Sequence, residues 1–377
     1  MSELFSPLQL RGVTVKNRLV LAPLCQYSAS DGIASDYHLV HFGRFALGGF
    51  GIVMIEATAV TPEGRISHGD LGLWADRQIE PLARIARFLR EQGAIPAIQL
   101  SHAGRKASTR RPWRGEGTVI AADRDELGDA PWPTVAPSAL AHADGYAQPS
   151  ALDDSGIGHI RTAFADAARR ALSAGFEIVE LHCAHGYLLH QFLSPIANRR
   201  TDAFGGSIEN RMRLPLLIAE DLRRIWPDNQ PVFVRVSASD HIQGGWTMDD
   251  TIIFARELNM LGVDVVDCSS GGFDGAAFNA FSDYHVPYAE RLARETGART
   301  MAAGLIVSPE QAEKVVSERQ VNLVGLARAA LLAPNWPLRA GLDLEGPAFA
   351  AAAWPEQAGW ALRDRLNSLS TEATPST

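Results

Sequence analysis

Side chains that can transfer protons or hold charge recur at the ends of short apolar segments of this chain. Histidine, tyrosine and cysteine are common acids, bases and nucleophiles in enzymes, and arginine is a frequent ligand of anionic groups. The residues concerned are, in chain order, Cys25, Tyr27, Gln99, His182, His185, Tyr187, Arg235 and Arg328. A chain that needed only to fold would have no reason to gather these types at strand ends. We therefore expect them to form one site.

Each of these residues alone also has a structural interpretation. A single cysteine near a strand is often a small buried apolar residue. Arg235 could instead belong to a buried ion pair with Glu56, Glu180 or Asp267. His182 and His185 have the residue type of metal ligands, but no Asp or Glu adjoins them as a third ligand. The prediction of a site thus rests on the cluster, and a metal site remains an alternative.

Eight short apolar or β-branched segments, each followed by a stretch of helical periodicity, must position these residues. The segments are nearly continuous hydrophobic runs, which is typical of parallel strands covered by helices. They span 18–22, 51–57, 95–100, 177–182, 232–236, 263–268, 299–303 and 321–326. Because no linker separates the units, the order predicts a single (β/α)8 TIM barrel, whose catalytic residues come from the C-terminal ends of the strands.

Helix signals lie between the predicted strands. Ser308, Pro309 and Gln311 have the types and spacing of a helix start with a capping box, and 247–250 and 207–209 resemble it. A further helix is predicted at 161–174, closed by a glycine. Residues 108–150 are rich in Pro, Gly and Trp and too long for an ordinary connection. They predict an excursion over the barrel mouth after the third strand.

The ends of the seventh and eighth strands predict a phosphate site. Gly304 follows the seventh strand, and Ala327-Arg328 ends the eighth. Backbone N–H groups and a guanidinium can hold a dianion there, at the position where such barrels commonly bind phosphate. An organic cofactor anchored at this point would extend across the barrel mouth to Arg235, Gln99 and Cys25.

The composition limits the class of protein. The chain has 377 residues, 46% hydrophobic, and a formal net charge of −8, which argues against nucleic-acid binding. Its densest basic stretch, 105–114, is interpreted as a solvated loop or an anion-steering rim. No apolar run is long enough to span a membrane, and no secretory signal is recognisable. Three cysteines without CxxC spacing fit a reduced cytoplasmic protein.

At these residues the chain resembles the old yellow enzyme family, in particular its thermophilic-like ene-reductase branch. The resemblance runs from about Leu4 to Pro337. Its motifs are Ala22-Pro-Leu-Cys-Gln-Tyr27, Gln99-Leu-Ser-His-Ala-Gly-Arg-Lys106, His182-Cys-Ala-His-Gly-Tyr187 and Asn198-Arg-Arg-Thr-Asp-Ala-Phe-Gly-Gly-Ser-Ile-Glu-Asn-Arg211. The last is too long for chance agreement. Cys25 in place of the threonine of yeast-type members marks the branch.

The resemblance implies a noncovalently bound FMN. The residues that it implies around the isoalloxazine are Ala22, Pro23, Leu24, Cys25, Ala57 and Gln99, with Arg235 on the N1 side. It implies that Gly304, Ala327 and Arg328 hold the phosphate. Many relatives have glycine at the position of Ala327, but alanine keeps the N–H donor.

The resemblance also implies an NAD(P)H-dependent ene-reductase with two half-reactions. NADPH or NADH first reduces the FMN, and an activated alkene then takes up the hydride in the same pocket. His182 and His185 would bind the carbonyl or nitro oxygen, Tyr187 would protonate the α-carbon, and Tyr27 would line the pocket. Two alternatives are a metal-dependent barrel hydrolase that uses the histidine pair and a flavin-binding sensor that does not reduce alkenes.

The segment after the barrel is expected to contribute to assembly. We predict the barrel over 1–340, a C-terminal extension at a subunit interface over 341–367, and a disordered tail over 368–377. In this branch an aromatic or arginine near the C-terminus reaches the neighbouring pocket, so Trp360 is predicted as a substrate-binding residue of a homodimer or homotetramer. Trp354 is the competing candidate, and simple helix packing is the alternative.

Overall fold

The computed structural model describes residues 2–115, 117–277 and 280–372, and within them eight parallel strands close into one barrel. The strands follow one another around the barrel in chain order, which confirms the predicted (β/α)8 fold. Each overlaps one of the predicted segments. Their bounds are β3 (Leu19–Leu21), β4 (Ile52–Ala59), β5 (Ile95–Ser101), β8 (Ile178–Cys183), β9 (Val232–Ser237), β10 (Val265–Ser269), β11 (Arg299–Ala302) and β12 (Leu323–Leu326).

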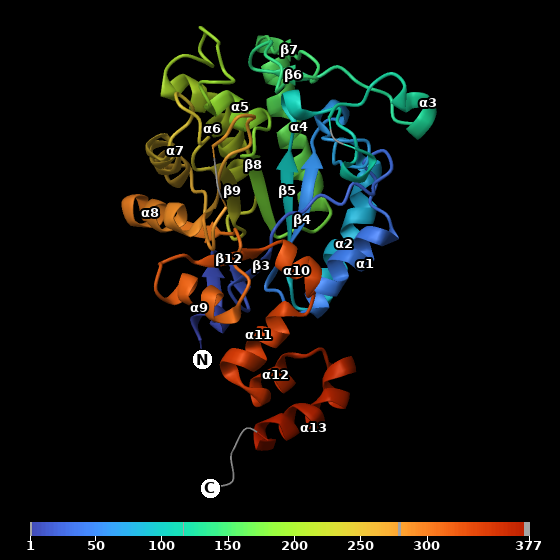
Figure 1. Cartoon of the computed structure of the whole chain (residues 1–377), viewed down its shortest axis with the longest axis vertical. Helices are drawn as coiled ribbons and strands as arrows, with labels where there is room; N and C mark the ends of the chain where they lie inside the picture. Colours follow the sequence, from blue (N-terminus) through green and yellow to red (C-terminus); the bar gives the residue numbers. More distant parts are fainter. Residues whose placement is uncertain (1, 116, 278–279, 373–377) are drawn as a thin grey trace.

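Helices surround the barrel, and each strand leads into at least one of them (Figure 1). In chain order they are α1 (Asp36–Leu47), α2 (Ile79–Glu91), α4 (Asp154–Ser173), the short α5 (Leu188–Leu193), α6 (Ile208–Ile225), α7 (Met248–Met260), α8 (Val286–Thr296), α9 (Pro309–Ser317) and α10 (Arg328–Leu332). The helix predicted from 161 begins earlier, at Asp154, because the side chain of Asp153 accepts a hydrogen bond from the Gly156 N–H and caps it.

Of the two capping boxes predicted before α7 and α9, one forms completely and the other only in part. Thr247 and Asp250 form a reciprocal capping box before α7, as the sequence indicates. Before α9, the hydroxyl of Ser308 accepts from the N–H of Gln311, but the Gln311 side chain accepts from the N–H of Val307 rather than of Ser308. The second half of that predicted box is therefore wrong, because the Gln311 amide oxygen is occupied by the N–H of Val307, one residue before the N-cap.

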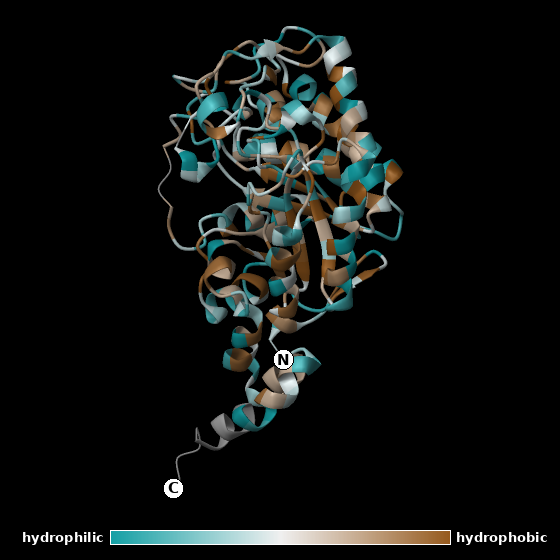
Figure 2. Ribbon diagram, turned by 90° about the vertical axis from the view of Figure 1, so that its right-hand side faces the viewer, coloured by the Kyte–Doolittle hydropathy of each residue, from teal (hydrophilic) through white to brown (hydrophobic). Residues whose placement is uncertain are grey.

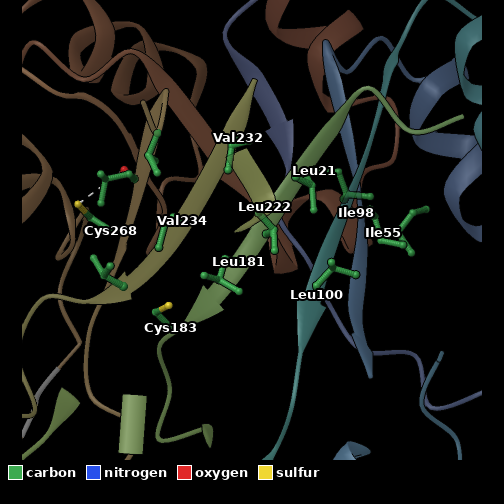
Figure 3. Packing of buried hydrophobic residues seen from close by; sticks show 14 of the residues in the cluster. Leu21, Ile55, Ile98, Leu100, Leu181, Cys183, Leu222, Val232, Val234 and Cys268 are labelled. Atoms are coloured by element: carbon green, nitrogen blue, oxygen red, sulfur yellow. Dashed lines mark hydrogen bonds between the residues drawn. The ribbon is translucent and has the colours of Figure 1, made fainter. Parts of the chain in front are cut away.

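The core has two layers that follow from the alternation of side chains along each strand. Outward-facing residues pack against the helices, as Figure 3 shows for Leu181 and Val234 on neighbouring strands with Leu222 of α6. Figure 2 shows the barrel strands coloured as hydrophobic and much of the helical surface as hydrophilic. Inward-facing residues fill the barrel interior away from the mouth: Val20, Ile52, Met54, Ala97, Ile178, Phe233, Val265, Met301 and Leu323.

A hairpin that the sequence analysis did not predict closes the bottom of the barrel. Strands β1 (Leu8–Leu10) and β2 (Val13–Val15) pair in antiparallel fashion, and Leu8, Leu10 and Val15 pack on the inward-facing layer. Both strands alternate buried and exposed residues, but three residues are too few for a clear periodic signal. The barrel interior is therefore sealed with apolar side chains at this end.

The excursion predicted after the third barrel strand lies between β5 and α4. It contains the 3-10 helices η4 (Gly104–Lys106) and η5 (Pro112–Arg114), the short helix α3 (Asp123–Leu127), and the paired strands β6 (Val135–Ala136) and β7 (Ser150–Ala151). Figure 1 shows α3, β6 and β7 at the end of the molecule toward which β4 and β5 point. The excursion thus lies over the mouth.

The C-terminal helices lie at the opposite end. Helices α11 (Trp336–Glu345), α12 (Pro347–Ala353) and α13 (Glu356–Glu372) project beyond the bottom of the barrel in Figures 1 and 2. The backbone is helical over the first part of the segment predicted as a tail, and its last residues, 373–377, lie outside the described residues. No helix in the described residues is long and apolar enough to cross a membrane.

Candidate active site

The register of the parallel strands sets three charged or polar side chains next to one another. His182 of β8 is paired with Arg235 of β9, and Arg235 is paired with Asp267 of β10. The Arg235 Nε atom lies 3.0 Å from Oδ2 of Asp267, and both side chains are almost fully buried. Of the three ion-pair partners that the sequence allowed, Asp267 is the one used.

A second acidic residue lies in the same buried layer. Gln99 of β5 is paired with Glu180 of β8, and its Nε2 donates to Glu180 Oε1 at 2.8 Å. Burial and then the nearby Asp267 raise the pKa of Glu180, whereas Arg235 and the Gln99 hydrogen bond lower it, and the net pKa is about 8. Burial also raises the pKa of Asp267. This layer therefore holds Arg235 and Gln99 in fixed positions beneath the mouth.

The two histidines and the tyrosine predicted as catalytic lie together at the end of β8. The ring centroids of His182 and His185 are 5.0 Å apart, and that of Tyr187 is 5.1 Å from His182. Burial, and then the charge of Arg235, lowers the pKa of both histidines well below the usual value. Burial raises the pKa of Tyr187 well above its usual value. All three rings are therefore neutral near pH 7.

The histidines have different hydrogen-bond partners. Nδ1 of His182 accepts from the N–H of Ala184 at 3.2 Å, so the proton of this neutral ring is on Nε2. Nε2 of His185 lies 2.6 Å from Oγ of Ser269 at the end of β10. His185 and Gly186 have left-handed backbones with φ of 60° and 72°, and α5 begins only at Leu188.

Cys25 and Tyr27 form the opposite side of the mouth, after β3. Both are half-buried, and they pack with a small apolar cluster that includes the excursion: Ile66, Ala103, Ala107, Trp132 and Tyr187. Burial, with smaller contributions from Asp70 and Glu56, raises the pKa of the Cys25 thiol well above its usual value. The thiol is therefore protonated and a weak nucleophile at neutral pH.

The other residues predicted around a cofactor also lie at the mouth end of the strands. Ala22, Pro23 and Leu24 follow β3, and the Ala22 N–H donates to the carbonyl of Leu326. Ala57 lies in β4, where the pairing with β5 shifts register between Ile55 and Thr58. This irregularity resembles the bulges that are common beside active sites.

A cavity leads from His185 to the predicted phosphate end. It has an empty volume of about 680 Å³ and is lined by residues that include His185, Arg235, Ser269, Gly304, Ala327 and Arg328. Gly304 has φ of 109°, and a Cβ at this position would lie 2.9 Å from Cε1 of Tyr284. Within the described residues the exposed guanidinium of Arg328 makes no hydrogen bond or ion pair. The three predicted phosphate residues thus share one cavity.

The interpretation of the basic stretch 105–114 as a solvated loop or anion-steering rim is wrong. Arg105 is only 6% exposed, and Nζ of Lys106 donates to the carbonyls of His185 and Gly272. Arg110 pairs with Asp123, and Arg111 and Arg114 both pair with Asp129. These three arginines therefore form ion pairs within the excursion, and Lys106 stabilises the turn at His185 by hydrogen bonds to backbone carbonyls.

Sequence reasoning missed the roles of several residues at the mouth. Tyr284 and His285, just before α8, line the cavity, and Ser237, Ser269 and Lys106 contact the histidine turn. Ser269 and Lys106 lie in segments that the sequence marked as strand ends, but nothing in their spacing indicates a partner. Trp360 is 73% exposed on α13, at the end of the molecule away from the mouth (Figure 1). It therefore does not line the mouth of its own chain.

Comparisons with known proteins agree with this geometry. The model of the "NADH:flavin oxidoreductase / NADH oxidase family" matches residues 3–345. An NADPH dehydrogenase from Geobacillus sp. (strain WCH70) is 40% identical over 359 residues, which cover 95% of this chain and 98% of that protein.

Solved structures give the same result. Morphinone reductase is 26% identical with a TM-score of 0.75, over 91% of this chain and 90% of that chain. A 2-naphthoyl-CoA reductase complex gives a TM-score of 0.80 at 25% identity over 91% of this chain, which spans about half, 52%, of that longer chain.

Proposed function

The chain belongs to the NADH:flavin oxidoreductase / NADH oxidase family and is an oxidoreductase of the old yellow enzyme type, and from this premise we propose that it is an ene-reductase. Its substrates would be α,β-unsaturated carbonyl or nitro compounds. NADPH or NADH would be the reductant, and the two would use the same pocket in turn.

The residues present fit a noncovalent FMN. Gly304 and Gly325 keep one wall of the cavity free of side chains. Arg235, held by Asp267, would face the N1 side of the isoalloxazine, where a cation stabilises negative charge. The N–H groups of Gly304 and Ala327 and the unpaired Arg328 suit a phosphate. When bound, FMN accepts a hydride from the nicotinamide and supplies it to the alkene.

The histidine pair would bind and polarise the substrate oxygen. Both rings are neutral, so neither brings a full positive charge to the site, and His182 presents its Nε2–H as a donor. A fixed donor in a buried site stabilises an oxygen on which negative charge develops. Tyr187 would protonate the α-carbon, since its phenol retains its proton at neutral pH. Tyr27 would line the pocket opposite.

The observation that carries this proposal is the group of three neutral rings at the end of β8, of which His185 lines the same cavity as Arg235. A metal-dependent hydrolase would need a ligand set, and no three His, Cys, Asp or Glu side chains in the described ranges gather as one. A flavin-binding sensor would not need a proton donor beside an oxygen-binding pair. These points favour the ene-reductase over both alternatives.

An anaerobic spectral titration tests the proposal. NADPH, or NADH in a parallel titration, should bleach the yellow protein, and 2-cyclohexenone should restore the colour without oxygen. Denaturation should release FMN and not FAD. Bleaching that the enone cannot reverse would favour a sensor, and a colourless protein that FMN does not reconstitute would contradict the proposal.

Trp360 would complete the pocket of a neighbouring subunit in a homodimer or homotetramer. The support is its position: it is exposed on a helix that projects away from its own mouth. Light scattering at micromolar concentration measures the assembly. A strict monomer would contradict this assignment, and loss of substrate affinity in Trp354→Ala but not in Trp360→Ala would transfer the role to Trp354.

A further inference from the structure

The backbone turn at His185 and Gly186, between His182 and Tyr187, is closed by one backbone hydrogen bond, from the Tyr187 N–H to the Ala184 carbonyl (3.2 Å), and is otherwise held by side chains. His185 and Gly186 both have positive φ, a conformation that is costly for a residue with a Cβ unless its surroundings fix it. All four of their backbone polar groups bond to side chains. His185 N–H donates to Ser237 Oγ (3.0 Å), Lys106 Nζ to His185 O (2.8 Å), Gly186 N–H to His190 Nδ1 (2.8 Å) and Gln191 Nε2 to Gly186 O (2.7 Å).

The space around the turn allows little movement. A Cβ on Gly186 would lie 2.3 Å from the carbonyl oxygen of Gly272, and one on Gly272 would lie 2.1 Å from the carbonyl carbon of His185. The two loops are therefore in direct backbone contact. A shift in the Gly186 peptide would carry the preceding imidazole and the following phenol with it, since they belong to its immediate neighbours.

One of the four partners belongs to a buried dyad. His190 and Asp240 are both completely buried, and Nε2 of His190 lies 2.9 Å from Oδ1 of Asp240. The other carboxylate oxygen accepts from the Ser194 hydroxyl (2.5 Å) and the Trp246 N–H (2.7 Å). Burial alone would raise the pKa of Asp240, but His190 and these donors together lower it. Asp240 is therefore an ionised acceptor, with two hydrogen bonds to Oδ2 and with Oδ1 facing the His190 ring.

This arrangement fixes the tautomer of His190. The Gly186 N–H can only donate, so Nδ1 carries no proton, and an ionised carboxylate only accepts, so the ring proton is on Nε2, toward Asp240. Nδ1 then keeps the lone pair that accepts the Gly186 N–H. In the opposite tautomer, an Nδ1–H would face that N–H, and two donors would meet in a site that water does not reach.

We propose that His190, oriented by Asp240, is a positioning residue of the substrate site: it fixes the Gly186 peptide and thereby the places of His185 and Tyr187. His190 is completely buried and does not line the cavity. Partners of this kind, which orient a residue that contacts the ligand, change metal affinity or activity by about 10- to 100-fold in other sites. The consequence for catalysis rests on the proposed function, whereas the tautomer of His190 does not.

The decisive variant is Asp240→Asn. The Ser194 hydroxyl and the Trp246 N–H would hold the amide oxygen, so the amide NH2 would face His190 and donate to Nε2. This moves the ring proton to Nδ1 and breaks the bond to Gly186 without removing any heavy atom of the dyad. Ser194→Ala is the matched control, because it removes one outer bond and leaves the His190–Asp240 contact in place.

Two measurements separate positioning from general stability. Histidine-selective 15N NMR reports the tautomer of His190, which should be protonated on Nε2 in the wild type and in Ser194→Ala but on Nδ1 in Asp240→Asn. Affinity of the holoenzyme for p-hydroxybenzaldehyde, and kcat/KM with 2-cyclohexenone, should each fall about tenfold or more in Asp240→Asn. FMN content and Tm are recorded for each variant.

A second pair of variants covers the case in which Asp240→Asn does not fold. His190→Asn places an amide oxygen near the former position of Nδ1, so the affinity for p-hydroxybenzaldehyde should stay within a few fold of the wild type. His190→Leu offers no acceptor there and should lose this affinity. A wild-type His190 protonated on Nδ1 would overturn the proposal, as would equal phenol affinity in Asp240→Asn and wild type. If the His190 tautomer and the affinities for p-hydroxybenzaldehyde change as expected but the protein reduces no enone, the ene-reductase function would be contradicted and the positioning role would stand.

Discussion

Nδ1 of His182 accepts a hydrogen bond from the backbone N–H of Ala184 at 3.2 Å. The bond closes within the loop that carries the ring, so the tautomer is set locally and does not depend on the substrate. His182 therefore offers an Nε2–H to the mouth at any pH above its lowered pKa. This donor is the basis of the first prediction.

His182→Ala should weaken binding of 2-cyclohexenone and slow its reduction. The loss of one fixed donor to an oxygen that gains negative charge should cost about 2–4 kcal/mol in kcat/KM, as for deletions in oxyanion holes. Steady-state kinetics with 2-cyclohexenone measure the loss in kcat/KM, and titrations with p-hydroxybenzaldehyde measure the loss in binding. His159→Ala, on the outer helix α4, is the matched control. An unchanged kcat/KM would remove His182 from the oxygen-binding role.

Tyr187→Phe should affect only one half-reaction. The phenol has a proton to give when the alkene is reduced but no proton to give during reduction of FMN by the nicotinamide. Stopped-flow measurement should show an almost unchanged rate of reduction by NADPH and a much slower reoxidation by 2-cyclohexenone. Equal slowing of both steps would argue against the tyrosine as acid and leave water as the donor.

Cys25→Ser should change the FMN midpoint potential and both half-reaction rates while activity remains. The thiol lies beside the proposed isoalloxazine site, and burial keeps its pKa far above neutral, so it is not a thiolate nucleophile. Spectroelectrochemistry measures the potential. Cys183→Ala, in the apolar layer outside the barrel, should leave the potential unchanged. Complete loss of turnover with FMN still bound would indicate covalent chemistry at Cys25.

Lys106→Met should alter how stability depends on pH. Burial, and then repulsion from Arg105, lowers the pKa of Lys106 from 10.5 to about 8. Above pH 8 the folded protein releases this proton while the unfolded chain still binds it, so this residue makes folding more favourable as pH rises toward 10.5. Below pH 8 both states are protonated and the contribution is constant.

Urea unfolding between pH 7 and pH 10 measures this effect as a difference between proteins. The wild type should gain stability with pH relative to Lys106→Met, and Lys314→Met, at an exposed position on α9, should follow the wild type. Parallel curves for all three proteins would show that Lys106 keeps its proton in the folded state.

The sequence was sufficient for the barrel but not for the contacts that hold its site. Continuous apolar runs identified the strands, and local types such as Ser207 or Thr247 identified helix starts, because these signals act over a few residues. The residue types at the strand ends likewise predicted which side chains meet at the mouth. The strands β1 and β2 were missed because each has only three residues.

The supports of the histidine turn could not be read from the sequence. Lys106 lies in η4, Ser237 at the end of β9 and Gly272 after β10, and their contact with the His185–Gly186 turn depends on strand register and on the left-handed backbone. Lys106 lies in a run of cations that resembles a solvated surface. Only the fold shows that its ammonium points inward, to two carbonyls that would otherwise lack a donor.

The hairpin at the bottom of the barrel also restricts the route by which small molecules can enter and leave. Because β1 and β2 seal that end with Leu8, Leu10 and Val15, no ligand can pass through the barrel axis. If the proposed function holds, reductant and alkene would arrive and depart through the same opening. The spent nucleotide would then obstruct the entry of the alkene until it leaves, and its residence time would set an upper limit on the turnover rate.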